Sequence, residues 1–396
     1  MIEVYNKALD TTIKVNRIIG KIEGDKYGPT LVFFGGIHGN ETSGVFALKR
    51  VFNNIKPAQV KGTIYGISGN LNALEKHKRY MEDDLNRLWT KQQIKSISRK
   101  RVLNSDEKEL VALFNLLNEI LQTNKPPFYF VDLHTTSSKT LPFITINDAL
   151  INRKFSQQFP VPIVLGIEEY LNGPLLSYIN QLGYVSLGFE SGQHDDLSAI
   201  TNSEAFVYLA LAYSGVLDEK AVANLLEYQE QLKTHAKHTN AIFEVVHLHK
   251  IHRGERFEML NGFKSFEAVK RGTPLALSNS IEVASPYTGN IFMPLYQKKG
   301  AEGFFIIKPI KPFFLKLSAV LRKIKTDTLL AWLPGISWEN KAEGVLQVNI
   351  TVAKFLAKPL FHLLGYRNRQ ITSTHLRLNN RERVAKTEVY KSEPWY

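Results

Sequence analysis

The sequence predicts an α/β protein, built on a mixed, mostly parallel sheet with helices on both faces and followed by a small all-β domain. Through residues 1–238, short apolar runs typical of buried strands alternate with longer stretches of helical periodicity, as in parallel sheets. Polar side chains follow three of the predicted strands, at the edge where such sheets bind ligands. From about residue 241, short alternating strands are separated by Gly and Pro turns, which predicts the β domain over residues 239–310.

Composition limits the chemistry that the chain can use. Its 396 residues are 44% hydrophobic, which is enough to bury the cores of two or three domains. Because the chain contains no cysteine, disulfides and thiolate metal sites are excluded, and a metal must bind His, carboxylate or carbonyl groups. The N-terminus lacks a charged-then-apolar signal pattern, and the chain lacks a run of about 18 apolar residues that would predict a membrane-spanning helix. We therefore expect a cytoplasmic protein.

The first predicted element of the sheet is the strand Leu31–Phe34, whose four apolar residues precede Gly35 and Gly36. The two glycines allow a sharp turn, and the segment Ser43–Val51 then predicts a helix. The later elements continue the same alternation. We expect strands at Val60–Ser68, Phe128–Leu133, Phe143–Ile146, Val161–Leu165 and Tyr184–Phe189, and helices at Asp106–Asn124, Gly173–Gly183, Asp195–Ser214 and Glu219–His238.

Three predicted strands end at residues that can bind a metal or move a proton. His38 and Glu41 follow the strand Leu31–Phe34, and His134 and Glu190 follow two later strands. Imidazole nitrogen and carboxylate oxygen both suit Zn²⁺, and a catalytic zinc site usually has three protein ligands and one water. We therefore predict one zinc ion per chain on His38, Glu41 and His134. The spacing of His38 and Glu41 alone is weak evidence, because a polar loop that caps a helix has the same pattern.

Other polar residues suggest how such an ion would be used. Burial in the apolar setting GFESG would raise the pKa of Glu190 toward neutrality, which makes Glu190 the candidate general base and acid; its alternative is a surface acid at a strand end. Asp132 lies two residues before His134, where it could orient the imidazole or cap the next turn. Donors for a carboxylate and for a developing oxyanion are available from Arg79, Asn86 and Arg87.

Four motifs in order, GGIHGNE, DDLNR, DLHTTS and GFESG, resemble those of the succinylglutamate desuccinylase/aspartoacylase family, a branch of the zinc carboxypeptidase-like hydrolases. The resemblance covers about residues 25–310 and implies a zinc-carboxypeptidase-like fold that includes the small β domain. For single residues it implies zinc binding by His38, Glu41 and His134, general base and acid catalysis by Glu190, polarisation of the scissile carbonyl by Arg87, substrate binding by Asn86, and a place in the pocket lining for Arg79.

Two departures from the family pattern concern the substrate. In aspartoacylases an arginine about ten residues before the catalytic Glu binds the side-chain carboxylate of the substrate, and here that position is near Asn180. A tyrosine that enters the pocket from the β domain of aspartoacylases corresponds to Phe304–Phe305, which has no hydroxyl. We therefore expect neutral or apolar N-acyl amino acids to be better substrates than N-acetylaspartate, unless Lys139 or His194 replaces the missing arginine.

The sequence as a whole favours a zinc-dependent amidohydrolase that cleaves the amide bond of an N-acyl amino acid, with zinc-bound water as the nucleophile. A small-molecule N-acyl amino acid is the expected partner, and we expect no nucleic acid. Two alternatives stay open. One is a metallocarboxypeptidase that acts on short peptides, and the other is a non-catalytic binding protein that retains the fold.

Residues 311–396 form a basic, aromatic-rich C-terminal extension. The extension holds 15 Lys and Arg residues and 6 Asp and Glu residues, so it contributes +9 to the net charge of +13. Its segments Phe313–Leu321 and Val352–Leu364 are apolar at helical spacing, with basic residues between. These segments could dock on a membrane surface, but we favour a cover for the protein's own core or a homo-oligomer contact.

Overall fold

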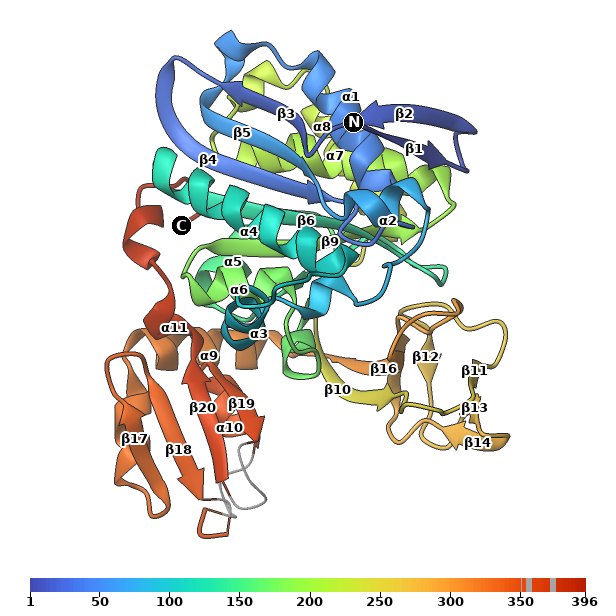
Figure 1. Ribbon diagram of the computed structural model, residues 1–396. Helices are drawn as coiled ribbons and strands as arrows, with labels where there is room; N and C mark the ends of the chain where they lie inside the picture. Colours follow the sequence, from blue (N-terminus) through green and yellow to red (C-terminus); the bar gives the residue numbers. More distant parts are fainter. Residues whose placement is uncertain (350, 354–357, 371–374) are drawn as a thin grey trace.

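The computed structural model describes residues 1–349, 351–353, 358–370 and 375–396. Within them, the largest sheet has 11 strands, and helices flank it, which confirms the predicted α/β class (Figure 1). In the order of the sheet, the strands are β12 (Ala268–Val269), β15 (Gly289–Phe292), β16 (Glu302–Pro309), β10 (Ile242–Lys250), β8 (Ile163–Leu165), β7 (Phe143–Ile146), β9 (Val185–Gln193), β6 (Phe128–Thr136), β4 (Lys26–Gly35), β5 (Lys61–Ser68) and β3 (Ile18–Glu23).

The middle of this sheet is parallel and its margins are antiparallel. Strand β4 pairs in parallel with β5 and β6, and β6 pairs in parallel with β9. Strands β3 and β7 join this group antiparallel, through β5 and β9. Strand β8 pairs in parallel with β7 and with β10, so the first strand of the β domain continues the sheet of the preceding domain. The sheet is therefore mixed, with its parallel strands at the centre.

Helices cover both faces of the sheet because apolar residues occupy successive positions of its central strands. In β4, Leu31 and Phe33 belong to one core cluster, while Val32 and Phe34 belong to another on the opposite face. The first cluster packs against α1 (Ser43–Asn54), α5 (Leu150–Ser156), α7 (Leu197–Tyr213) and α8 (Leu225–His235). The second packs against α3 (Lys91–Ile97), α4 (Ser105–Thr123) and α6 (Leu175–Gln181).

Two predicted strand ends differ from the structure. Strands β6 and β9 continue past their apolar runs to Thr136 and Gln193, so His134 and Glu190 lie inside strands rather than after them. The two residues are cross-strand partners in the parallel pair. The predicted ends were too early because backbone pairing continues where side chains turn polar, which an apolar run does not reveal.

Shorter elements complete the first two domains. The N-terminal hairpin pairs β1 (Ile2–Asn6) with β2 (Thr11–Val15), and α2 (Leu71–Glu75) follows β5. In the β domain a separate sheet of three strands joins β11 (Phe257–Met259), β13 (Pro274–Ser278) and β14 (Ile281–Ala284) within the described residues. The predicted small all-β domain is therefore present. Short 3₁₀ helices are η1 (Pro57–Gln59), η2 (Leu85–Arg87), η3 (Ile167–Glu169) and η4 (Glu219–Ala221).

The C-terminal extension folds around a second, smaller sheet. The described residues give it a four-stranded sheet in the order β17-β18-β20-β19, with its own apolar core. Part of the predicted helical segment Val352–Leu364 lies outside the described residues. The elements are α9 (Pro312–Lys323), η5 (Thr326–Trp332), β17 (Ile336–Asn340), β18 (Val345–Asn349), α10 (Lys358–Leu363), β19 (Tyr366–Gln370), β20 (His375–Asn380), α11 (Arg381–Val384) and η6 (Thr387–Tyr390).

The last residues of the chain return to the main core. Tyr390 and Trp395 are buried in the same cluster as the central strands. The Tyr390 hydroxyl donates to the Phe128 carbonyl and accepts from the Val185 amide, and Trp395 Nε1 donates to the Tyr129 hydroxyl over 3.1 Å. Figure 1 shows the extension and the β domain as separate lobes on the same side of the α/β domain. The boundaries at residues 238 and 310 stay a prediction.

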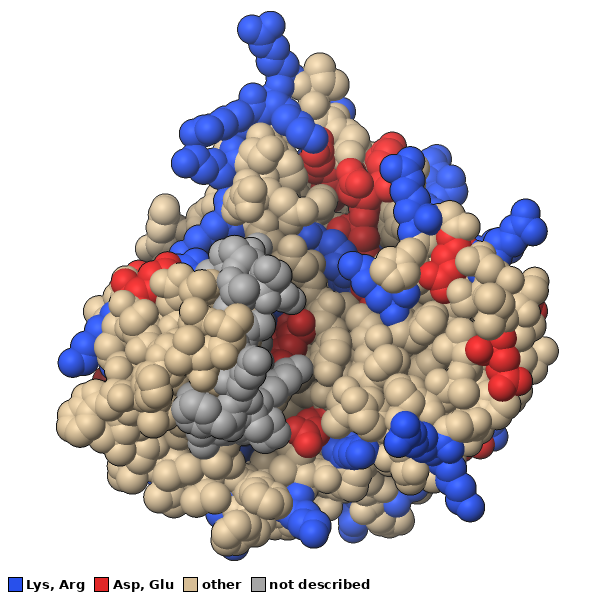
Figure 2. Space-filling view, turned by 90° about the horizontal axis from the view of Figure 1, so that it is seen from below, with Lys and Arg blue, Asp and Glu red and all other residues tan. Residues whose placement is uncertain are grey.

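Figure 2 shows the face of the molecule that carries these two lobes. Lys and Arg side chains project mainly around the margin of this face, and acidic side chains are visible in a hollow near its centre. Among the helices of the described ranges, none has the length and apolar character that crossing a bilayer requires.

Candidate metal and catalytic site

The loop between β4 and α1 presents the first two residues of the site. Gly36 directly follows β4 and has a φ of +74°, a left-handed conformation that favours glycine. A Cβ at Gly36 would also lie 2.7 Å from the Leu74 side chain. The turn therefore depends on glycine, and it places the buried side chains of His38 and Glu41 at the carboxyl end of the sheet.

His38, Glu41 and His134 converge in the structure as the sequence predicts. Their candidate ligand atoms all lie within 4.8 Å of one another. Nδ1 of His38 lies 2.9 Å from Glu41 Oε1, and Nδ1 of His134 lies 2.9 Å from Glu41 Oε2. Two imidazoles thus point the same ring nitrogen at one buried carboxylate.

The opposite nitrogen of each imidazole meets another carboxylate. His134 Nε2 lies 2.7 Å from Asp132 Oδ2, and His38 Nε2 lies 3.2 Å from Asp84 Oδ1. Metal-binding histidines commonly donate their second N–H to a carboxylate, which fixes the ring and leaves the other nitrogen free to bind. The ring orientation therefore fits ligation through Nδ1 in both residues.

The charge of the cluster also fits a bound cation. Burial alone would raise the pKa of Glu41, but the neighbouring His38 and His134 outweigh it and hold this pKa well below its usual value. Burial alone would lower the pKa of His134, but Asp132 and Glu41 raise it well above its usual value. A proton on the His134 imidazole thus helps to balance the buried carboxylates here, and a divalent ion in the same place would balance them too.

Two further donors fix Glu41. Arg79 Nη1 donates to Glu41 Oε1 over 3.1 Å, and the Thr135 amide donates to Glu41 Oε2 over 3.1 Å. Arg79 Nη2 also lies 3.6 Å from Asp84 Oδ2. The Arg79 side chain therefore lines the pocket as predicted, and its observed partners are the carboxylates around the cluster.

Glu190 faces this cluster from β9. It is 8% exposed, and its Oε2 atom has no hydrogen-bond partner among the described residues. Burial raises the pKa of Glu190 to about 7, opposed by the positive charge of His134 and supported by the negative charge of Glu41. A carboxyl group with this pKa can accept and release a proton near neutral pH.

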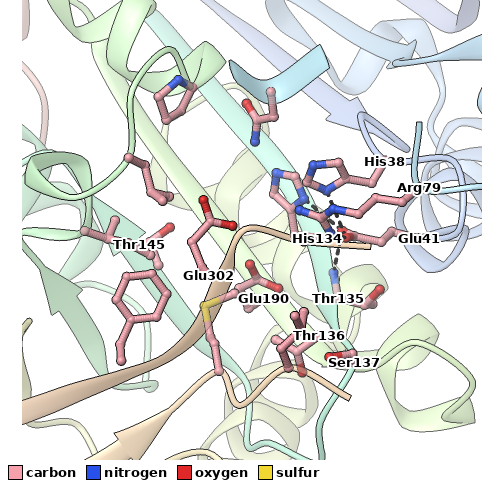
Figure 3. A pocket seen from close by; sticks show the side chains of 18 of the residues that line it. His38, Glu41, Arg79, His134, Thr135, Thr136, Ser137, Thr145, Glu190 and Glu302 are labelled. Atoms are coloured by element: carbon pink, nitrogen blue, oxygen red, sulfur yellow. Dashed lines mark hydrogen bonds and ion pairs between the residues drawn. The ribbon is translucent and has the colours of Figure 1, made fainter. Parts of the chain in front are cut away.

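The cluster and Glu190 share one pocket, and Figure 3 shows Glu190 beside the group of His38, Glu41 and His134. The cavity has a volume of about 130 Å³. Pockets for drug-sized ligands have volumes of roughly 300–1,000 Å³, so this cavity suits a small molecule.

Asn86 and Arg87 lie on η2 and line the same pocket. Asn86 Oδ1 accepts from the Leu175 amide at the start of α6 over 2.9 Å. Arg87 Nη2 donates to Glu302 Oε1 over 2.9 Å, and Arg87 Nε donates to the same oxygen over 3.3 Å. Burial would lower the pKa of Arg87, but Glu302 and Asp84 outweigh it and raise this pKa.

Sequence reasoning missed two acids of the site. Asp84 is the N-cap of η2, and it also contacts the His38 ring. Glu302 enters the pocket from the β domain, two residues before the predicted position Phe304–Phe305. The sequence did hold a signal for Glu302, because it is an acid at the start of β16, a strand whose next residues are mainly apolar.

Neither predicted substitute for the missing arginine supplies a charge at the cluster. Lys139 is exposed and does not line the pocket. His194 does line it, with Nδ1 2.7 Å from Thr135 Oγ1, but burial lowers the pKa of His194 and keeps the ring neutral near pH 7. Asn180 is buried in α6 outside the pocket lining.

Comparisons with known proteins agree with the motifs. Residues 27–213 match the family model of the succinylglutamate desuccinylase/aspartoacylase catalytic domain. The curated succinylglutamate desuccinylase of Pseudomonas fluorescens is 30% identical over 89 residues, which are 22% of this chain and 27% of that protein. The chain thus matches about a quarter of the length of that relative.

Solved structures share the fold. The succinylglutamate desuccinylase/aspartoacylase from Rhodobacter sphaeroides aligns with a TM-score of 0.57 and 15% identity, over 78% of this chain and 94% of that one. The ectoine utilization protein EutE (DoeB) from Ruegeria pomeroyi aligns with a TM-score of 0.55 and 15% identity, over 73% of this chain and 87% of that one. At these identities the similarity shows the fold alone.

Proposed function

We propose that this protein is a zinc-dependent hydrolase of the succinylglutamate desuccinylase/aspartoacylase family that cleaves the amide bond of an N-acyl amino acid. The match of residues 27–213 to the catalytic-domain model of that family supports the proposal. The observation that carries the proposal is the buried His38–Glu41–His134 cluster, with the unpartnered Oε2 of Glu190 in the same pocket of the described chain. This arrangement favours the hydrolase over the metal-free binding protein that the sequence left open.

The zinc ligands would be His38, Glu41 and His134, held by Asp84, Asp132 and Arg79. A zinc ion bound there supplies Lewis-acid polarisation of a carbonyl and lowers the pKa of water. The protein's own contribution to the chemistry begins with Glu190, which accepts a proton from the attacking water. Glu190 then gives this proton to the amide nitrogen as the C–N bond breaks, so that a carboxylic acid and a free amine leave.

Substrate binding would use η2. The bond from the Leu175 amide to Asn86 Oδ1 fixes the Asn86 side chain and leaves its Nδ2 group as the donor for a substrate oxygen. Arg87 carries five N–H groups, of which Glu302 and the Asn86 carbonyl take three, and the others can donate to a substrate carboxylate. Arg87 could equally polarise the scissile carbonyl, which is the role that the resemblance implies.

The decisive test is the Glu190→Gln variant. We expect it to bind zinc in a 1:1 ratio, measured by elemental analysis, but to lose about 10²–10⁴-fold in kcat because an amide cannot accept the proton. Released amine from a panel of N-acyl amino acids gives the rate, and a panel of short peptides tests carboxypeptidase activity. Glu282→Gln, which removes an exposed acid of the β domain, is the matched control. A near-native kcat in Glu190→Gln would remove Glu190 from the mechanism.

Two predictions of the sequence are carried forward with this proposal. One is a location in the cytoplasm. The other is a homo-oligomer contact through the C-terminal extension, where Phe313, Val320 and Trp332 are exposed apolar residues that such a contact would cover.

A further inference from the structure

The ion pair of Arg87 with Glu302 joins two domains inside the pocket. Glu302 is the first residue of β16 in the β domain, and Arg87 is the last residue of η2 in the preceding domain. Their side chains are 18% and 24% exposed, so water screens the pair only in part. Figure 3 shows Glu302 on the side of Glu190 that is away from the cluster, toward Thr145.

Glu302 changes what the pocket can accept. A substrate carboxylate that binds Arg87 leaves two carboxylates, its own and that of Glu302, sharing one guanidinium. A buried carboxylate without a full partner is costly, and the pocket offers no second free cation near this point in the described chain, since Arg79 bonds to Glu41 and His194 is neutral. A positive charge on the substrate would restore the balance.

The walls beside Glu302 suit the chain that would carry this charge. Leu171, Leu295 and Phe305 line the same cavity and offer apolar surface to methylene groups. An alkyl chain that ends in an ammonium group would bury its methylenes there and place its charge against an acid. The other acid of this wall, Glu168, already has a cation, because Arg381 lies 2.7 Å from its Oε1.

We propose that Glu302 is a specificity-determining residue that selects N-acyl amino acids with a cationic side chain, as in Nα-acyl-ornithine or Nα-acyl-lysine. The substrate carboxylate takes its place on Arg87, and the side-chain ammonium pairs with Glu302. This inference rests on the proposed function and names the substrate class of the same site. It ranks cationic side chains above the neutral or apolar ones expected from the sequence, and it keeps N-acetylaspartate as a poor substrate.

The first test compares matched substrates on the zinc-loaded full chain. Nα-acetyl-lysine and N-acetylnorleucine share their methylene chain and differ by the ammonium group. We expect kcat/KM for the lysine derivative to exceed that for the norleucine derivative by about tenfold or more, and that for N-acetylaspartate to be the lowest of the three. A preference for norleucine or aspartate would overturn the proposal.

The second test asks whether Glu302 causes the preference. In Glu302→Gln the ratio of kcat/KM between the lysine and norleucine derivatives should fall at least fivefold, while Glu282→Gln, in the same domain, keeps the wild-type ratio. The ratio separates recognition from a structural role. If both substrates lose activity equally in Glu302→Gln, the residue only holds the two domains together, and the proposal is wrong.

A binding measurement separates this inference from the proposed hydrolysis. Calorimetric titration of Glu190→Gln with Nα-acetyl-lysine and N-acetylnorleucine needs no turnover. We expect tighter binding of the lysine derivative, and we expect that difference to disappear in the double variant Glu190→Gln/Glu302→Gln. If the wild type hydrolyses no acyl compound, the proposed function fails, and this titration still decides the inference. Hydrolysis of the panel with equal binding of the two ligands would reject the inference alone.

Discussion

Replacement of Arg381 by Met tests whether the C-terminal extension forms part of the pocket wall. Arg381 begins α11, and its Nη2 lies 2.7 Å from Glu168 Oε1 and 3.2 Å from Glu169 Oε1. The Arg381 and Glu168 side chains are 6% and 1% exposed, and Glu168 lines the pocket from η3. The variant would leave the buried Glu168 without its cation, whereas Glu169 would keep the His362 ring, whose Nε2 lies 2.9 Å from Glu169 Oε2.

The size of the effect follows from the burial of Glu168, whose side chain is 1% exposed. Removing one partner of a buried ion pair leaves the other charge uncompensated, and this typically costs about 3–5 kcal/mol. We therefore expect the free energy of unfolding to fall by about 3–5 kcal/mol.

The same change should alter substrate binding more than chemistry. Glu168 lies on the wall of the pocket, whereas Glu190 and the cluster lie on β9, β6 and the loop after β4. We expect KM in Arg381→Met to rise about tenfold with a smaller change in kcat. Urea unfolding followed by circular dichroism measures the stability, and steady-state kinetics on the best substrate of the panel measure KM.

Arg383→Met is the matched control. Arg383 lies on the same helix, but its partner Asp327, at 2.9 Å, belongs to the extension itself. This variant should lose stability and keep its KM. An unchanged KM in Arg381→Met, or an equal rise in both variants, would show that the extension does not shape the pocket.

Two further predictions concern the metal and pH. His134→Ala should lose zinc. Asp132→Asn should bind zinc about 10–100-fold more weakly, because Asp132 holds the His134 ring. Competition with a chelator measures this affinity, and full zinc affinity in Asp132→Asn would count against the site. Stability should fall as the pH drops below about 4, near the ordinary pKa of Asp. Burial would raise the pKa of Asp148, but Arg153, Arg322 and Arg381 outweigh it and hold this pKa well below its usual value in the folded protein. The ionised Asp148 therefore stabilises the fold fully above the pKa that it has in the unfolded chain, and this contribution is lost as the pH falls. Urea unfolding at pH 3 and pH 7 measures this, and Asp148→Asn should show a smaller difference between the two.

The sequence was most informative where the evidence is local. Apolar runs located the central strands, and Gly35–Gly36 located the turn that presents His38 and Glu41. The motifs located His134 and Glu190 two and three residues before their strand ends, and parallel pairing of β6 and β9 brings them together. These features depend on short segments whose pattern is visible in the chain itself.

The residues that were missed depend on contacts between distant segments. Arg87 and Glu302 are 215 positions apart, and Arg381 and Glu169 are 212 positions apart. Hydrophobic periodicity says which face of a strand is buried, but it does not say which acid meets which base across a domain boundary. Asp84 shows a second limit, because its position before η2 predicts a helix cap equally well whether or not it also contacts His38.

The contacts of Arg322 and Arg381 change how the positive charge of the C-terminal extension is interpreted. A net charge of +9 suggests a surface that attracts anionic partners, but the count does not say where the cations lie. Arg322, whose side chain is 1% exposed, donates to Asp148 Oδ2 over 2.6 Å, and Arg381 pairs with Glu168 and Glu169. Those three acids belong to the α/β domain. Part of the excess positive charge therefore holds the extension against the pocket wall. The positive charge exposed to a partner in solution is smaller than the net charge of the extension suggests.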